Sequence, residues 1–125
     1  MVKETVDLAN LPEIDLRLYR GDSAVLEFEV NDAAGVPLAL GGASITMQAR
    51  RDTGKPDTLF SLSSAGGEIT FSDGLIRIGF TAPLLQTATW RTAVYDVETA
   101  FADGRRYTLW RGCVELVHDV TKGNP

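Results

Sequence analysis

Residues 24–30 read Ala-Val-Leu-Glu-Phe-Glu-Val, and the alternation in this stretch decides the fold class. The apolar side chains at its even positions are Leu26, Phe28 and Val30. Glu27 and Glu29 lie between them, so one face of an extended segment is apolar and the other carries charge. Because successive side chains of a β-strand point to opposite faces, a period of two predicts a strand that is buried on one side only.

The same period of two recurs along the chain and indicates a protein built of strands. It is seen at Ile14–Leu18, Ile45–Arg50, Ile69–Phe71 and Ile76–Phe80, and two longer strands are expected at Trp90–Phe101 and Arg105–Val117. The one segment compatible with a short helix is Ala82–Ala88, where Pro83 suits a first helical turn. We expect this segment to cross from one sheet to another.

Two Asp-Gly pairs predict tight turns, because Asp-Gly tolerates the positive φ angles of a type I′ turn. Asp73–Gly74 is therefore expected to join residues 68–72 to residues 75–80, and Asp103–Gly104 to join the two longer strands. The tripeptide Arg20-Gly21-Asp22, which integrin ligands display, is interpreted here as the turn between two strands.

The last long run changes phase. Tyr107 and Leu109 are apolar at odd positions, whereas Val114 and Leu116 are apolar at even positions. A regular strand cannot place both pairs on one face, and one extra residue would restore the pattern. We therefore predict a β-bulge or sharp bend at Arg111–Gly112, where the glycine would supply unusual backbone angles.

These patterns predict an all-β fold, a two-sheet antiparallel β-sandwich of seven or eight strands and immunoglobulin-like size, with one short helical crossover near residues 82–88. A small closed barrel is the alternative. The Cys, Trp, Cys constellation of true immunoglobulin domains is missing, so the likeness is one of architecture. Residues 14–121 would form the sandwich, residues 1–13 an N-terminal arm and residues 122–125 a frayed tail.

The composition is that of an acidic globular domain. The 125 residues are 44% hydrophobic and carry a formal net charge of -5. Such a chain is a poor partner for phosphate backbones, so nucleic acid is not an expected partner. No apolar run approaches the ~20 residues of a spanning helix, and the start lacks the apolar region of a secretory signal. We expect synthesis in the cytoplasm and no membrane association.

The residues that usually carry catalysis or bind metals are few. Cys113 and His118 are the only cysteine and histidine, so neither an intrachain disulfide nor a zinc site is expected. Cys113 is interpreted as a small apolar strand residue. The serines form no nucleophile elbow, no phosphate-binding glycine loop occurs, and alternating acids such as Asp96 and Glu98 suit a solvated outer face. The sequence therefore predicts a protein that is not an enzyme and uses no cofactor or metal.

Cationic and aromatic side chains are the remaining candidates for a binding surface. If Leu109 points inward, then Trp110 points outward, and an exposed tryptophan between Arg106 and Arg111 would suit the centre of an interface. The other interpretation packs Trp110 under the bend at Gly112. A second cluster, at a charged loop tip, comprises Arg50, Arg51 and Lys55.

Several of these motifs follow one another in a recognisable order. They are Arg20–Val30, Asp32–Gly42, Ile45–Arg51, Ile69–Phe80, Thr81–Pro83, Trp90–Val97 and Leu109–Leu116. In this order the chain resembles a group of small phage and prophage structural proteins with an immunoglobulin-like sandwich, among them the N-terminal domain of phage baseplate upper proteins. The resemblance covers roughly residues 14–121.

The resemblance implies a non-enzymatic virion component of the tail or baseplate. Such a protein is made in the host bacterial cytoplasm and docks onto other phage structural proteins, within a homo-oligomer or ring in the particle. Capsid decoration, a head–tail or fibre adaptor, and a carbohydrate-binding host-adhesion module are the alternatives. Residues 1–13 are expected to cross to a neighbouring subunit and add a strand to its sheet.

Overall fold

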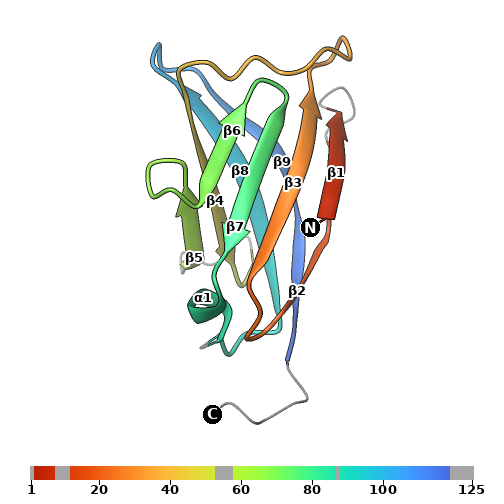
Figure 1. Cartoon of the computed structure of the whole chain (residues 1–125), viewed down its shortest axis with the longest axis vertical. Helices are drawn as coiled ribbons and strands as arrows, with labels where there is room; N and C mark the ends of the chain where they lie inside the picture. The colour runs from red at the N-terminus through yellow and green to blue at the C-terminus, as the bar shows by residue number, and fades with distance from the viewer. Residues whose placement is uncertain (1, 8–11, 53–57, 87, 119–125) are drawn as a thin grey trace.

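The computed structural model describes residues 2–7, 12–52, 58–86 and 88–118, and this part of the chain forms two facing sheets (Figure 1). The four-stranded sheet has the order β1 (Val2–Asp7), β3 (Ala24–Asn31), β7 (Leu75–Phe80), β6 (Ile69–Ser72). The five-stranded sheet has the order β2 (Leu16–Tyr19), β9 (Arg106–Val117), β8 (Thr92–Phe101), β4 (Ala43–Arg50), β5 (Thr58–Ser63). The prediction of an all-β, two-sheet, sandwich-like fold is confirmed.

The helix also lies where the sequence predicted it. Helix α1 (Ala82–Gln86) follows β7 of the four-stranded sheet and precedes β8 of the five-stranded sheet, so it forms the crossover between them. Strands β1 and β5 were not expected from the periodicity. Two of the strand pairs, β1 with β3 and β2 with β9, are parallel, so the prediction of purely antiparallel pairing is wrong for them.

The first residues of the chain pair with their own domain. Strand β1 runs along β3 of the same chain, with Val2 opposite Leu26 and Asp7 opposite Asn31. The segment that we expected to reach a neighbouring subunit therefore has a place in the four-stranded sheet of its own chain. That it contacts a neighbouring subunit stays a prediction.

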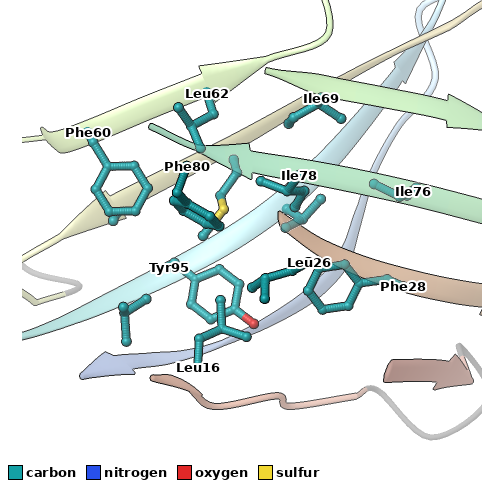
Figure 2. Close-up of a cluster of buried hydrophobic side chains, with 14 of the residues drawn as sticks. Leu16, Leu26, Phe28, Phe60, Leu62, Ile69, Ile76, Ile78, Phe80 and Tyr95 are labelled. Atoms are coloured by element: carbon teal, nitrogen blue, oxygen red, sulfur yellow. The ribbon is translucent and has the colours of Figure 1, made fainter. Parts of the chain in front are cut away.

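The core fills the space between the two sheets (Figure 2). The side chains that define the period of two are buried, with Leu26 at 7% exposure and Phe28 and Val30 at 0%. From the other sheet, the ring of Phe60 lies 6.0 Å from the rings of both Phe80 and Trp90. Each large apolar side chain buried in this way contributes roughly 1.5–3 kcal/mol to the free energy of unfolding.

Both predicted Asp-Gly hairpins are present. Asp73–Gly74 joins β6 to β7, and Gly74 has a φ of 75°. The β8–β9 turn is longer than a two-residue turn, because Gly104 donates its backbone N–H to the Phe101 carbonyl (2.9 Å) while Phe101 donates to the Arg105 carbonyl (2.9 Å). The φ of 95° at Gly104 fits this three-residue loop with a glycine bulge.

The predicted irregularity in the last strand exists, but it lies at Leu109 rather than at Arg111–Gly112. Trp110 is opposite Val97 and Thr108 is opposite Glu98, so Leu109 is the extra residue. Leu109 and Trp110 are both buried, at 3% and 1% exposure. Because two successive residues point inward here, the even-numbered residues that follow also point inward.

Gly112 is required for a different reason from the one predicted. It does not adopt a positive φ. A Cβ atom at this position would lie 2.0 Å from the carbonyl oxygen of Ile14, because the chain segment before β2 passes directly over the glycine. The glycine therefore permits a close approach of two backbones, which any side chain would prevent.

Candidate interaction surface

Trp110 belongs to the core and does not present its ring to solvent. Its ring centroid lies 4.6 Å from that of Phe28, and the side chain is 1% exposed. Of the two interpretations of Trp110, exposure between Arg106 and Arg111 is therefore wrong and burial is confirmed, because the extra residue Leu109, rather than a bend at Gly112, turns position 110 inward. Trp110 packs beneath the surface that carries those two arginines.

A chain of hydrogen bonds links Trp110 to the segment that precedes β2. The indole Nε1–H of Trp110 donates to the hydroxyl oxygen of Tyr95 (3.0 Å), and that hydroxyl donates to the carbonyl oxygen of Ile14 (2.6 Å). The buried indole N–H of Trp110 and the buried hydroxyl of Tyr95 thus both have a hydrogen-bond partner, as polar groups away from water require. Trp110 and Tyr95 fix the path of residues 12–14 across β9.

The outer face of the five-stranded sheet contains a shallow depression of about 410 Å³, which we call the sheet-face hollow. It is lined by Glu13, Gln48, Arg50, Val94, Tyr95, Asp96, Arg111, Gly112 and Cys113. Strand register places Gln48, Asp96 and Arg111 in one row across β4, β8 and β9. Charged side chains of both signs therefore meet on an open surface, which suits recognition of another protein surface.

Asp96, one of the acids that line the sheet-face hollow, has a shifted pKa. Partial burial raises the pKa of its carboxyl group, the negative charge of Glu98 raises it further, and the nearby Arg50 opposes both effects. A raised carboxyl pKa means that the folded protein tolerates this negative charge less well than the unfolded chain does. Asp96 is thus the group on this face that would benefit from a cationic partner.

Replacing Asp96 by asparagine is expected to stabilise the isolated protein at neutral pH. Because the pKa of Asp96 is raised in the folded protein, its negative charge lowers the free energy of unfolding once the pH rises above the ordinary aspartate pKa of about 3.9. Asparagine carries no charge and removes this cost. The gain should stay below about 1 kcal/mol, because a half-buried carboxylate is partly screened. Urea unfolding at pH 7 and pH 3 measures it, and the gain should vanish at pH 3.

Asp103→Asn provides a control of opposite sign. Hydrogen bonds from the backbone N–H and then the side chain of Arg105 lower the pKa of Asp103, so this carboxylate favours folding above its lowered pKa. The variant should therefore be less stable than the natural chain at pH 7 and equal to it at low pH. If Asp96→Asn and the natural chain were equally stable at both pH values, the folded protein would not disfavour the charge of Asp96.

A second, larger depression lies at one end of the sandwich, and we call it the end groove. Its volume is about 1210 Å³. Its apolar lining residues include Leu38, Ala39, Phe101, Tyr107, Leu109 and Trp110. Glu13 and Arg111 line both the end groove and the sheet-face hollow, so the two depressions meet at this pair.

The exposed aromatic side chain at the end groove is that of Tyr107, whereas both tryptophans are buried. Tyr107 is 49% exposed, and its ring lies edge-on to that of Phe101 at 6.2 Å. The guanidinium of Arg105 lies 4.7 Å from the centre of the Phe101 ring, and its Nε bonds to Asp103 (2.7 Å). In the sequence, the signal for this surface is the pair of apolar residues at odd positions before the phase change, Tyr107 and Leu109, which both line the end groove.

The predicted cationic residues are only partly brought together. Arg50 and Arg111 line the sheet-face hollow, and Arg106 lies 4.0 Å from Glu98 on the same face. Arg51 is exposed just after β4, whereas Lys55 lies outside the described residues. The side chain of Arg111 has no hydrogen-bond or ion-pair partner within the described ranges. Arg111 is therefore a cation available to a partner where the two depressions meet.

The cysteine and histidine take no part in a cluster. Cys113 lies in β9 but is exposed, contrary to its interpretation as an apolar residue, because odd positions after the extra residue Leu109 face outward. His118 contacts the backbone oxygen of Trp90 through Nε2 (3.2 Å). The described residues contain no group of three or more His, Cys, Asp or Glu that could hold a metal ion. Nor does that part of the chain include a helix long and apolar enough to cross a membrane.

Comparison with known proteins identifies the fold. No family model and no curated protein matches the sequence. Among solved structures, the chain is similar to the N-terminal domain of phage TP901-1 ORF48, with a TM-score of 0.55 and 12% sequence identity. The similarity covers 95% of this chain and 99% of that one. It shows a shared fold, and for the fold it confirms the resemblance to phage domains that the sequence indicated.

Proposed function

We propose that the chain is a non-enzymatic structural protein of a phage virion, and that it docks onto other phage proteins in the tail or baseplate. The observation that carries this proposal is the shared fold with a phage domain over nearly the whole length of both chains. The motif order of residues 14–121, which resembles the N-terminal domain of phage baseplate upper proteins, supports the same role. A location in the virion follows from the proposal.

We also infer that the sandwich is immunoglobulin-like. In the order β1-β3-β7-β6, the strands take the places of A, B, E and D of an immunoglobulin domain. In the order β9-β8-β4-β5 they take the places of G, F, C and C′, with β2 added beside β9. The parallel pairing of β1 is a departure from that scheme.

The surface chemistry supports docking. The sheet-face hollow and the end groove are both open, and they combine arginines, acids and apolar side chains. Arg50, Arg106 and Arg111 are the residues we assign to contacts with acidic groups of a partner, together with Arg51, which is exposed directly after β4. Protein–protein interfaces are enriched in arginine and aromatic residues. The end groove offers one of each kind, Arg111 and Tyr107.

Immunogold electron microscopy tests the proposal. An antibody to the purified protein is applied to virions of the phage that encodes it, and label at the tail end is the expected result. Label over the head would replace the tail role by capsid decoration. Label on no particle would overturn the virion role. In that case, glycan-array binding that is lost in Tyr107→Ala would support the carbohydrate-binding alternative, because Tyr107 is the exposed aromatic of the end groove.

A further inference from the structure

Strand β6 is one edge of the four-stranded sheet, and β1 is the other (Figure 1). It lies within residues 58–86, which the structure describes without a gap except before β5 and after α1, so no undescribed segment leads into it. Its pairing with β7 is regular, from Ile69 opposite Ile78 to Ser72 opposite Leu75. On its other side the described residues place no strand. Such an edge is a template for pairing with another extended chain.

The hydrogen bonds between β6 and β7 show which backbone groups face the open side. Gly79 donates its N–H to the carbonyl of Glu68 (2.8 Å), so Glu68 bonds toward β7. Because bonded positions alternate along an antiparallel pair, Thr70 also bonds toward β7. Ile69 and Phe71 therefore direct their N–H and C=O groups away from β7. None of these four groups has a hydrogen-bond partner among the described residues.

The three other sheet edges each carry a feature that hinders pairing. Strand β1 has three charged residues among its six, and β2 carries Arg17. Strand β5 contains the extra residue Leu59, and the N–H of Ser63 is already bonded to the carboxylate of Glu68 (3.0 Å). Charges, prolines and bulges are the usual protection of an edge. Strand β6 has none of these and is protected only by its shortness.

The open backbone groups of β6 are complementary to those of a second β6. Ile69 and Phe71 flank Thr70 symmetrically, so an antiparallel copy with Thr70 opposite Thr70 places each Ile69 opposite the other copy's Phe71. Both of these pairs exchange two hydrogen bonds, and every outward group is then satisfied. Phe71, which is only half-buried in one chain, meets the other copy's Ile69 on the core side. On the outer face the two threonines form a favourable cross-strand pair.

The distribution of charge favours an uncharged occupant. Each copy has a net charge of -5, so two copies repel each other over most of their surfaces. Residues 58–72 contain one charged residue, Glu68, whose carboxylate accepts the N–H of Ser63 (3.0 Å). On the neighbouring β7, Arg77 is paired with Glu27. A charged strand would find no free counter-charge at this edge, whereas a second β6 brings none.

We propose that two copies of the chain pair through β6, antiparallel around a two-fold axis at Thr70, and so join their four-stranded sheets into one. Because only four residues of each strand take part, the pair is weak in dilute solution and becomes effective where copies are held close together. The proposal does not depend on the virion role. Absence of immunogold label would leave it standing, and failure of the pairing would leave the virion role standing.

Thr70→Lys tests the pairing by charge. Thr70 is exposed, so the fold should persist, but two ammonium groups would lie directly opposite each other across the axis, and like charges in that position are unfavourable. Thr70→Val keeps a β-branched side chain and is the matched control. Sedimentation velocity measures self-association, in the presence of a reductant because Cys113 is exposed. Circular dichroism confirms that each variant is folded.

The average mass of the natural chain is expected to rise from that of a monomer toward that of a dimer between about 10 μM and about 1 mM. Thr70→Lys should raise the dissociation constant at least about tenfold, while Thr70→Val stays within about threefold of the natural chain. Hydrogen exchange locates the contact, because the amides of Ile69 and Phe71 should exchange more slowly at the higher concentration.

A pair of cysteine variants tests the register, and it keeps the proposal testable if Thr70→Lys fails to fold. Both are made with Cys113→Ser. Thr70→Cys meets its own copy at the axis, with Cβ atoms about 4.5–5.5 Å apart, which is close to disulfide geometry. Ser72→Cys is exposed on the same face of the same strand, but about 14 Å of strand separates it from its copy, too far for a disulfide.

Mild oxidation should therefore crosslink Thr70→Cys at least about tenfold faster than Ser72→Cys, because only the first brings its sulfur atoms within reach. The pairing is overturned if the natural chain stays monomeric at about 1 mM, a concentration that would reveal even a weak dimer. It is also overturned if a folded Thr70→Lys associates as the natural chain does, if protection appears on another edge, or if the two cysteine variants crosslink equally fast.

Discussion

Replacing Gly112 by alanine is expected to destabilise the protein by about 3 kcal/mol or more, because an added methyl group overpacks a site bounded by backbone. The new Cβ would lie 2.0 Å from the oxygen and 2.6 Å from the carbonyl carbon of Ile14. The segment cannot move away without cost. Ile14 accepts a hydrogen bond from the Tyr95 hydroxyl (2.6 Å) and donates one to Arg111 (2.9 Å), and displacement would break both.

Thermal and urea unfolding measure this effect, and Gly41→Ala is the matched control. A Cβ at Gly41 meets nothing within 4 Å, and its φ is not positive. That variant should lie within about 0.5 kcal/mol of the natural chain or be slightly more stable, because alanine restricts the unfolded state. If Gly112→Ala unfolded at the same urea concentration as Gly41→Ala, the close passage of residues 12–14 over β9 would be wrong.

The strands with strict alternation could be predicted from sequence, and the two that were missed lack it. In β1, Val2 and Val6 are separated by Glu4, so no continuous apolar face is visible. In β5, the adjacent apolar residues Leu59 and Phe60 interrupt the pattern. The structure explains this interruption. Ala49 of β4 lies opposite Phe60, but the next residue, Arg50, lies opposite Thr58, so Leu59 is an extra residue in β5. Irregular pairing with a partner strand is not visible in one strand's own sequence.

The irregularity in β9 was predictable in kind but not in place. The phase of apolar residues changes somewhere between Leu109 and Val114, and a glycine within that interval made Gly112 the obvious position. Only the pairing with Val97 and Glu98 assigns the extra residue to Leu109. The glycine was present for a contact with Ile14, which is 98 residues away in sequence and therefore beyond any local pattern.

The candidate surface was harder to predict than the fold. Arg50 and Arg111 were identified by their charge, and the sheet brings them into one hollow. The end groove, by contrast, combines residues near Glu13, Leu38, Asp73 and Tyr107, which only the completed sandwich places together. Such a groove depends on tertiary packing, whereas periodicity reports the burial of single strands.

Trp110→Ala is expected to destabilise the protein by about 3–5 kcal/mol, the usual cost of removing a large buried aromatic side chain. The variant leaves a cavity beside Phe28 and removes the hydrogen bond from the indole N–H to the Tyr95 hydroxyl. Because domains of this size are stable by about 5–15 kcal/mol, this is a large share of the total. Urea unfolding followed by circular dichroism measures the loss.

Tyr107→Ala, on the same strand, separates packing from recognition. Tyr107 is 49% exposed, so its removal should cost less than about 1 kcal/mol while altering the end groove. Any loss of docking in Trp110→Ala would then follow from lost folding, whereas a loss in Tyr107→Ala would report contact with a partner. A Trp110→Ala protein that unfolds like the natural chain yet fails to dock would instead place this tryptophan in the interface. That result would restore the arrangement in which Leu109 faces inward and Trp110 faces the partner.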